Sequence, residues 1–215
     1  MLQRKTKALR IAVAALGVVF VLLLVGLAES YYERFQAQNL ISILSDIQVG
    51  ATTESHAKEA TKQFSYFNQH PNGSVISNTK VTSDYFIFEN RAYWWLHLAP
   101  PKRTEISIDY ADGIVRSKTA SYYEGPGYGG VINEELQHTG TNRDLIRAEA
   151  GGRYAACNHG IPIRNCTAEC YQIVVHEDVT VPLARRRLDW QIDLSCMTSI
   201  GGCRDVRKIM RGAMR

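Results

Sequence analysis

The sequence predicts an α+β protein in which an N-terminal transmembrane helix is followed by an antiparallel-sheet domain with packed helices. The first observation is an apolar run, residues 11–28, without a charged or strongly polar side chain. The second is a pair of alternating segments, 106–110 and 114–119, that flank Asp112-Gly113, a dipeptide typical of two-residue β-hairpins. Helical patterns precede and follow these strands, so we expect helices to pack on a sheet of five or six strands.

The apolar run is long enough to cross a bilayer. An α-helix rises about 1.5 Å per residue, so the run spans roughly 27 Å, close to the hydrocarbon thickness of a membrane. The basic residues before it are Arg4, Lys5, Lys7 and Arg10, whereas Glu29 and Glu33 follow it. Lys and Arg near the ends of a span stay in the cytoplasm. The pattern therefore predicts a single-pass protein of the cell membrane, with residues 1–10 cytoplasmic and residues 29–215 extracytoplasmic (periplasmic).

A cleaved signal peptide is the alternative for the same run. Gly26-Leu27-Ala28 has the small-x-small pattern of a cleavage site. The run is longer than the apolar region of about 7–15 residues that signal peptides carry, which favours an uncleaved anchor. Both interpretations export the rest of the chain.

The charges of the chain are unevenly distributed. The formal net charge is +4, and the four basic residues before the span account for all of it. Residues 29–183 carry a net charge of −5 and residues 184–215 a net charge of +5. The basic end is suited to an anionic surface or to the acidic body of the same protein, and an exported location argues against a nucleic-acid partner.

Two helices are expected directly after the span. Residues 31–44 place apolar side chains at loosely helical spacing, so they continue the span or begin a second helix. Thr52 or Thr53 is suited to cap a helix that runs to about Phe67.

Strands follow at 85–88 and 93–98, and together with the two hairpin strands they predict a four-stranded antiparallel meander. Because Trp94 and Trp95 are adjacent, a strand would place them on opposite faces. We expect both rings in the core.

The second half of the chain begins with a glycine-rich loop at 122–130. This loop is the predicted partner-contacting element, through Tyr122, Tyr123 and Tyr128. Further strands are expected at 131–138, 171–176 and 179–181, a helix from Pro182 to Cys196, and a short basic helix at 204–210.

All five cysteines lie in a C-terminal third, residues 157–215. Outside the cytosol such cysteines usually form structural disulfides. We expect Cys196 to pair with Cys203, because Gly201-Gly202 lets the intervening chain fold back. A second pair is expected among Cys157, Cys166 and Cys170.

The alternative for the first three cysteines is a metal- or thiol-dependent site formed by Cys157, His159, Cys166 and Cys170, whose side chains are ligands that zinc accepts. The spacing fits no zinc module that we recognise, so no metal or cofactor is predicted. No catalytic residue is predicted either, since Glu134 and Glu135 would lie on opposite faces of a strand.

Two resemblances are carried by short motifs. The segments IQVGATTESHAKEA, WWLHLAPP and LSCMTSIGGCRD resemble a group of membrane-anchored, exported bacterial proteins of unknown function. Residues 40–120, with a VGATT step into a helix and a meander containing DGI, are similar to the SmpA/OmlA (BamE-like) envelope modules. That resemblance implies a small helix-plus-sheet module that helps to assemble outer-membrane proteins. The chain departs from it by its anchor, by the missing lipid-bearing cysteine and by its cysteine-rich extension.

The sequence therefore favours a non-enzymatic, membrane-anchored extracytoplasmic module that supports interaction or assembly in the bacterial envelope, with the bilayer and an unknown envelope protein as partners. Two alternatives stay open. One is the metal- or thiol-dependent enzyme centred on Cys157, His159, Cys166 and Cys170. The other is a ligand-binding ectodomain that works with a membrane partner.

Overall fold

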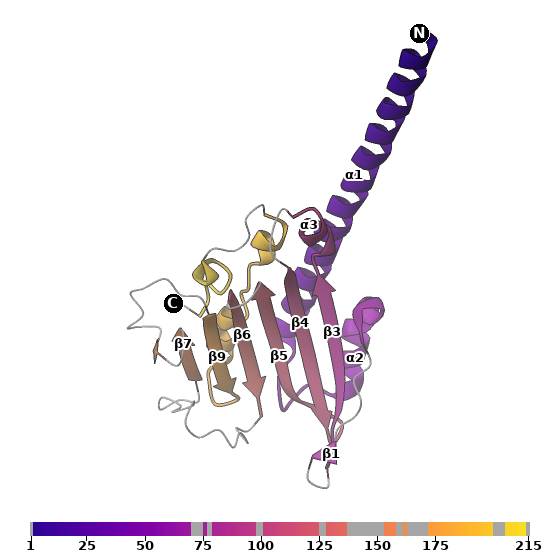
Figure 1. The fold of residues 1–215 in the computed structure, drawn as a ribbon. Helices are drawn as coiled ribbons and strands as arrows, with labels where there is room; N and C mark the ends of the chain where they lie inside the picture. The colour runs from indigo at the N-terminus through magenta and orange to yellow at the C-terminus, as the bar shows by residue number, and fades with distance from the viewer. Residues whose placement is uncertain are drawn as a thin grey trace.

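The structure, a computed structural model, combines one long helix with a mixed β-sheet (Figure 1). It describes residues 2–69, 75–76, 79–97, 101–124, 128–136, 153–157, 161–162, 172–199 and 205–213. Helix α1 (Leu2–Asp46) begins far from the sheet and ends behind it. Residues 31–44 thus continue the span, which was one of the two predicted outcomes.

The main sheet has the strand order β3-β4-β5-β6-β9-β7-β8. Its strands are β3 (Thr82–Glu89), β4 (Lys102–Ala111), β5 (Ile114–Glu124), β6 (Tyr128–Glu135), β7 (Arg153–Cys157), β8 (Ile161–Pro162) and β9 (Gln172–Asp178). A separate two-stranded ribbon pairs β1 (Val75–Ile76) with β2 (Thr79–Lys80). Strands β3 to β6 form an antiparallel meander, whereas β9 pairs with β6 in parallel. The sheet is therefore mixed rather than wholly antiparallel.

The central hairpin matches its prediction. Ala111 of β4 faces Ile114 of β5 across a two-residue turn. Asp112 has φ 55° and Gly113 has φ 77°, the left-handed conformations that a type I′ turn requires at both central positions. The ladder carries an irregularity farther along, because Asp109 faces Ser117 while the next residue, Tyr110, faces Val115.

The helix after α1 also matches its prediction. Helix α2 (Glu54–Thr61) is followed without a break by a 3-10 helix, η1 (Lys62–Phe67). The Thr53 side chain caps α2 by accepting a hydrogen bond from the backbone N–H of His56. Because Thr53 also bridges Ile114, the start of α2 is fixed to the turn end of the sheet.

The predicted strand at 93–98 is wrong, because the chain forms a short helix, α3 (Arg91–Trp95). Asn90 caps this helix by accepting a hydrogen bond from the backbone N–H of Tyr93. Trp94 and Trp95 are 51% and 76% exposed, so the expected core position of both rings is wrong as well. The fourth strand of the meander is β6 instead.

The C-terminal part contains less helix than predicted. Helix α4 (Leu183–Asp189) follows Pro182 as predicted but does not reach Cys196. Residues 191–193 belong to no helix or strand, and a 3-10 helix, η3 (Leu194–Thr198), comes after them. A second 3-10 helix, η4 (Val206–Lys208), lies inside the predicted basic helix. The strand expected at 179–181 is a turn, because Asp178 accepts a hydrogen bond from the Thr180 N–H.

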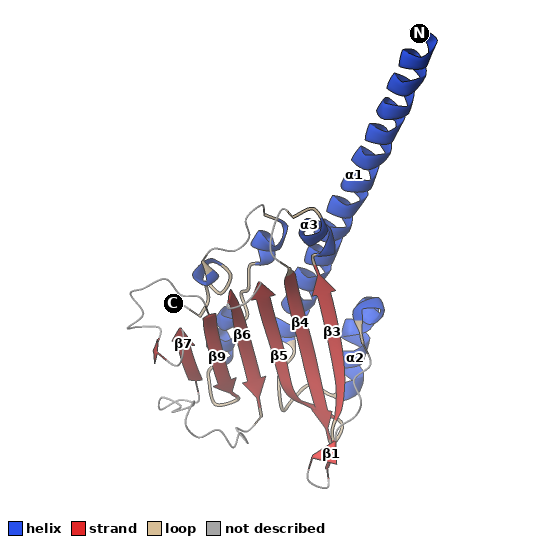
Figure 2. Cartoon of the chain, in the orientation of Figure 1, coloured by secondary structure: helices blue, strands red, loops and turns tan. Residues whose placement is uncertain are grey.

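In the view of Figure 2, the second half of α1 forms a layer behind the sheet, whereas α2 lies beside the edge strand β3 and α3 lies near the end of that strand. The core fills this layer with alternate strand residues, such as Phe86, Phe88, Ile106 and Ile108, packed against the second half of α1. The other face carries half-buried polar residues, among them Glu105, Ser107 and Asp109 of β4. An antiparallel sheet with one face on the core shows this alternation of apolar and polar side chains.

Candidate functional site

The first half of α1 is the most unusual surface of the molecule. Its apolar side chains, from Ile11 to Val25, are largely exposed and project away from the domain (Figure 1). The helix is long and apolar enough to cross a membrane, and none of its most apolar stretch is buried within the protein. This separates it from the core helix of a soluble protein, which has similar composition but is covered by its own fold.

The second half of the same helix is part of the core. Ala37, Leu40, Ile41 and Leu44 are almost completely buried, and their spacing places them on one face of the helix. The opposite face remains accessible at Phe35 and Ser42. The exposed apolar half and the domain are therefore joined by continuous helix.

Polar side chains fasten α1 to the C-terminal segment. The Gln38 amide donates to the Ile192 carbonyl at 2.7 Å and accepts from the Leu194 N–H at 3.0 Å, so it pairs with the backbone as a neighbouring strand would. One turn earlier, Arg34 donates to the Thr198 hydroxyl at 2.9 Å. These bonds hold residues 192–198 against the helix.

The start of the domain is tied to α1 by Asn90. Its side-chain oxygen accepts a hydrogen bond of 2.8 Å from the Ser30 hydroxyl, and its amide nitrogen donates to the Met197 carbonyl. Asn90 is buried, so these contacts replace its hydration. A single side chain thus connects α1, α3 and η3.

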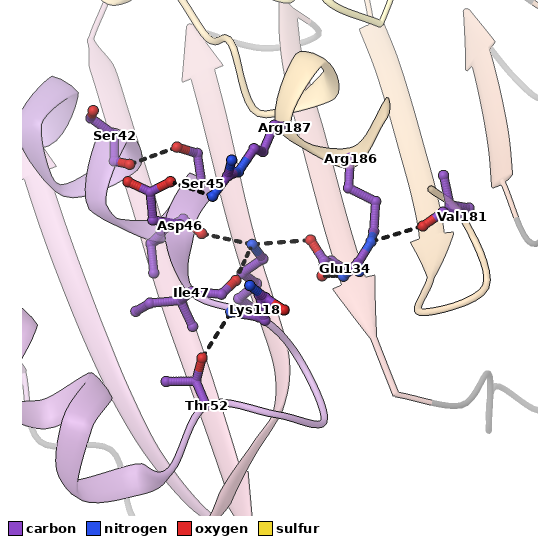
Figure 3. Close-up of polar contacts among 12 residues, drawn as sticks. Ser42, Ser45, Asp46, Ile47, Thr52, Lys118, Glu134, Val181, Arg186 and Arg187 are labelled. Carbon is purple, nitrogen blue, oxygen red and sulfur yellow. Dashed lines mark hydrogen bonds and ion pairs between the residues drawn. The ribbon is translucent and has the colours of Figure 1, made fainter. Parts of the chain in front are cut away.

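A buried lysine closes the C-terminal end of α1 (Figure 3). The Lys118 ammonium donates to the carbonyls of Leu44 and Ile47 at 2.6 and 2.8 Å, and it lies 3.0 Å from a Glu134 carboxylate oxygen. It also lies 4.5 Å from the centre of the Trp190 ring, within cation–π distance. Burial lowers the pKa of Lys118, and the nearby Glu134 carboxylate opposes that shift.

Glu134 extends this network to α4. Its second carboxylate oxygen pairs with Arg186, whose Nε donates to the Val181 carbonyl at 3.0 Å (Figure 3). All three charged groups are nearly inaccessible to solvent. Removing Glu134 would leave two buried cations without their counter-charge. The network links α1, the sheet and α4.

A second buried carboxyl, Glu177, has a raised pKa. Burial and the neighbouring carboxylates of Asp189 and Glu134 raise its pKa to about 8. Neither of its carboxyl oxygens accepts a hydrogen bond from any residue that the structure describes, and its interaction with Asp189 requires a proton between two acidic groups. Asp189 in turn forms an ion pair of 2.9 Å with Arg185. Both acids are buried inside the domain, where they lie between β9 and α4.

A small cavity lies between the sheet and the C-terminal segment, lined by residues that include Ile41, Thr104, Tyr122 and Met210. Its volume is about 10 Å³, whereas pockets for small molecules measure about 300–1,000 Å³. It has room for roughly one water molecule and gives no support to the ligand-binding alternative.

The tyrosines of the predicted partner-contacting loop are only partly exposed. Tyr122 and Tyr123 belong to β5 rather than to a loop, and Tyr122 is buried with its hydroxyl 3.0 Å from Glu124. Its role as a partner contact is therefore wrong. Tyr123 is 41% exposed and remains available, and the side chain of Tyr128 lies outside the described residues.

The cysteine predictions fall mostly outside the part of the chain that the structure describes. Cys157 ends β7 without a described side chain, and His159, Cys166, Cys170 and Cys203 are not described. Cys196 is disulfide-bonded, while its pairing with Cys203 stays a prediction. Among the described residues, no group of three or more His, Cys, Asp or Glu side chains could hold a metal ion. The Cys157, His159, Cys166 and Cys170 site is thus untested.

The features above define a class: an α+β domain carried on a helix that is long and apolar enough to span a membrane. The chain matches no protein-family profile, and no characterised protein or solved structure is significantly similar to it. The resemblance to SmpA/OmlA modules accordingly stays a prediction.

Sequence reasoning missed the buried charges. Glu134 was expected on the opposite face of a strand from Glu135, and that is confirmed, since Glu134 is buried and Glu135 is half-buried. Its partners Lys118 and Arg186 were not predicted. The only signal was Lys118 itself, a charged residue in the middle of a strand that is central in the sheet.

Proposed function

We propose that the protein is a single-pass membrane protein whose extracytoplasmic domain, residues 29–215, acts as a non-catalytic interaction or assembly-support module of the bacterial envelope. The observation that carries the proposal is the two-part character of α1. Its first half exposes apolar side chains on all sides, and its second half is locked into the domain core. A bilayer covers the first half without disturbing the second.

The orientation rests on charge. Arg4, Lys5, Lys7 and Arg10 precede the apolar run, and basic residues at the end of a span favour the cytoplasmic side. The disulfide-bonded state of Cys196 is consistent with an oxidising compartment for the domain. The uncleaved anchor is favoured over a signal peptide, because α1 continues past Ala28 and Gly26 packs against Ala92 of α3.

The first test is retention and topology of the full chain in bacterial membranes. We expect the intact chain to remain in the pellet after alkaline extraction. A protease added outside the inner membrane should degrade the domain and leave the N-terminal peptide protected. A soluble product beginning at Glu29 would instead establish a cleaved signal peptide and overturn the anchor.

The second test concerns the role as an interaction module. A photo-crosslinking amino acid replaces Tyr123, which is exposed, and in a matched variant it replaces His56 on α2. Mass spectrometry then identifies envelope proteins that are captured from Tyr123 and not from His56. Capture of the same proteins from both positions, or of none from Tyr123, would contradict a specific contact at this strand end.

A further inference from the structure

We propose that α3 is a membrane-interface helix, with Trp94 and Trp95 inserted in the headgroup layer of the bilayer that α1 crosses. The proposal rests on the membrane anchor of the proposed function. It adds a second point of attachment, which fixes the face of the domain that meets the lipid.

The position of α3 follows from three contacts with α1. A Cβ atom placed on Gly26 would lie 3.0 Å from the Ala92 Cβ, so the two helices approach closely where α1 has no side chain. Ser30 donates a hydrogen bond of 2.8 Å to Asn90, and the hydroxyl groups of Tyr31 and Tyr93 lie close enough to interact electrostatically. These contacts fix the height of α3 along α1.

That height coincides with the end of the apolar run. Gly26 lies two residues before the last apolar residue, Ala28, which corresponds to about 3 Å along the helix axis. The headgroup regions add roughly 5–8 Å to each side of the hydrocarbon core. If residues 11–28 cross the bilayer, α3 lies at the boundary between hydrocarbon and water.

The exposed side chains at this boundary are aromatic. Trp94 and Trp95 are 51% and 76% exposed, whereas Trp190 is buried in the core. Tyr31, Tyr32 and Phe35 on α1 are also more than half exposed. Trp and Tyr are enriched at both membrane–water interfaces, where an amphipathic ring has apolar and polar neighbours at once.

The helical conformation of α3 is what makes both rings available. In a strand the adjacent Trp94 and Trp95 would point to opposite faces, so one would enter the core. In a helix they are separated by about 100° around the axis, and here both rings are more than half exposed. Tyr93 is the residue of α3 that fills the buried side.

A lipid occupant is favoured over a protein because the bilayer is already adjacent. The contact of α3 with Gly26 places it against the span itself. The charges nearby are mixed, since exposed Arg91 pairs with Glu89 at 2.9 Å and also interacts with Glu29 and Glu33. We therefore expect attachment through the aromatic rings, without a requirement for anionic lipid.

The test uses tryptophan fluorescence of the full chain in phosphatidylcholine vesicles. The emission of Trp94 and Trp95 is the difference between the wild type and the double variant Trp94→Phe/Trp95→Phe, which leaves Trp190 in place. We expect this difference emission to fall by at least about half when the lipids carry bromine near the headgroup end of their chains. It should fall less when the bromine lies near the bilayer centre, and adding phosphatidylglycerol should not change it.

The matched control is His56→Trp in the double variant. His56 is exposed on α2, whose start hydrogen-bonds Gly113 at the far end of the sheet. Strand β4 spans roughly 33 Å from the end of the sheet near α3 to the end near Gly113. A tryptophan at position 56 therefore lies far from the bilayer, and it should be quenched by acrylamide and not by brominated lipid. We expect acrylamide to quench the Trp94 and Trp95 emission at least about threefold less than this control.

Two outcomes would overturn the proposal while leaving the anchor intact. One is acrylamide quenching of Trp94 and Trp95 equal to that of the control, which would place the rings in water. The other is the absence of lipid quenching in vesicles together with crosslinks from position 95 to a protein in native membranes, which would assign the surface to that protein. Release of the chain from vesicles by alkaline extraction would instead refute the proposed function itself.

Discussion

The two halves of α1 are one helix in two different surroundings. From Ile11 to Val25 the side chains are apolar on every side and exposed, whereas from Ala37 to Leu44 one face is buried and the other is accessible. A helix that is apolar all round needs an apolar medium, and an amphipathic helix needs a partner surface. Continuous hydrogen bonding along α1 shows that no loop is needed between the two.

The comparison also shows that the second half depends on polar contacts as well as on burial. Carbonyl groups at its C-terminal end are bonded by Lys118, and Gln38 bonds the backbone of residues 192 and 194. The exposed half has only its own backbone hydrogen bonds among the described contacts. Changes on the buried face of the second half should therefore destabilise the domain, and changes in the first half should not.

The largest expected effect is that of Lys118→Met. It leaves the Leu44 and Ile47 carbonyls without their donor and removes one of the two cations that pair with Glu134, so we expect the free energy of unfolding to fall by about 3–5 kcal/mol. Thermal unfolding of the detergent-solubilised chain, followed by near-UV circular dichroism, measures the loss. Lys62→Met on the exposed face of η1 is the control and should stay within about 0.5 kcal/mol of wild type. A loss below about 1 kcal/mol for Lys118→Met would show that the network is dispensable.

Leucine-to-alanine variants in the two halves test the comparison directly. Leu40→Ala removes buried methyl groups from the core and should cost about 2–5 kcal/mol. Leu22→Ala lies in the exposed half and should leave domain unfolding unchanged. Denaturant unfolding of both variants in the same detergent gives the two values, and equal losses would contradict the division of the helix.

The buried carboxyl of Glu177 makes stability depend on pH. Its pKa is raised in the folded state to about 8 from an ordinary 4.5. At a pH between these two values, folding is therefore accompanied by the uptake of a proton. The stabilisation from the protonated carboxyl is complete below pH 4.5 and decreases as the pH rises, by at most about 1.4 kcal/mol per unit until pH 8.

Unfolding midpoints measured from pH 5 to 8 check this slope. Glu177→Gln keeps the shape of the side chain without the titration, so its slope should be shallower than that of wild type. Glu59→Gln, on the exposed part of α2, should leave the slope as it is. Parallel slopes for wild type and Glu177→Gln would show that this carboxyl takes up no proton on folding.

Gln38→Ala should have the smallest effect of these substitutions. It removes a donor to Ile192 and an acceptor from Leu194, both at the edge of the core, and should cost about 1–2 kcal/mol. Hydrogen exchange of the Leu194 amide should quicken more than exchange in β4. Ser42→Ala, on the accessible face of α1, serves as the control, and a comparable change there would remove the special role of Gln38.

Local signals predicted much of the fold. The apolar run, the Asp112-Gly113 turn and the Thr53 cap each act within a few residues, and each lies where the sequence placed it. The pairing of strands that are distant in the sequence was not predicted, because no signal within a few residues specifies it. The parallel partner of β6 is β9, more than thirty residues later in the chain, and no short pattern encodes that choice.

Two errors have specific physical causes. The aromatic run after Asn90 favours a strand by composition, but Asn90 caps a helix and is held by Ser30 and Met197 from distant parts of the chain. Lys118 is buried because the irregularity beside Asp109 shifts the alternation of β5, so that Val115 and Lys118 share the covered face although they are three residues apart. Strict alternation from Val115 would have turned Lys118 to solvent.

The unbroken course of α1 has a mechanical consequence. Its 45 residues form a rod of about 68 Å; under the proposed function one part lies in the bilayer, and the other packs against the sheet. A rod without a hinge transmits every tilt of its embedded part undiminished, and a tilt of about 10° moves a point 30 Å away by about 5 Å. A span of roughly 27 Å is slightly short for a bilayer core of about 30 Å, so a thicker membrane pulls the rod upright rather than letting it lean. If α1 is anchored as proposed, the tilt of the domain relative to the membrane therefore depends on bilayer thickness.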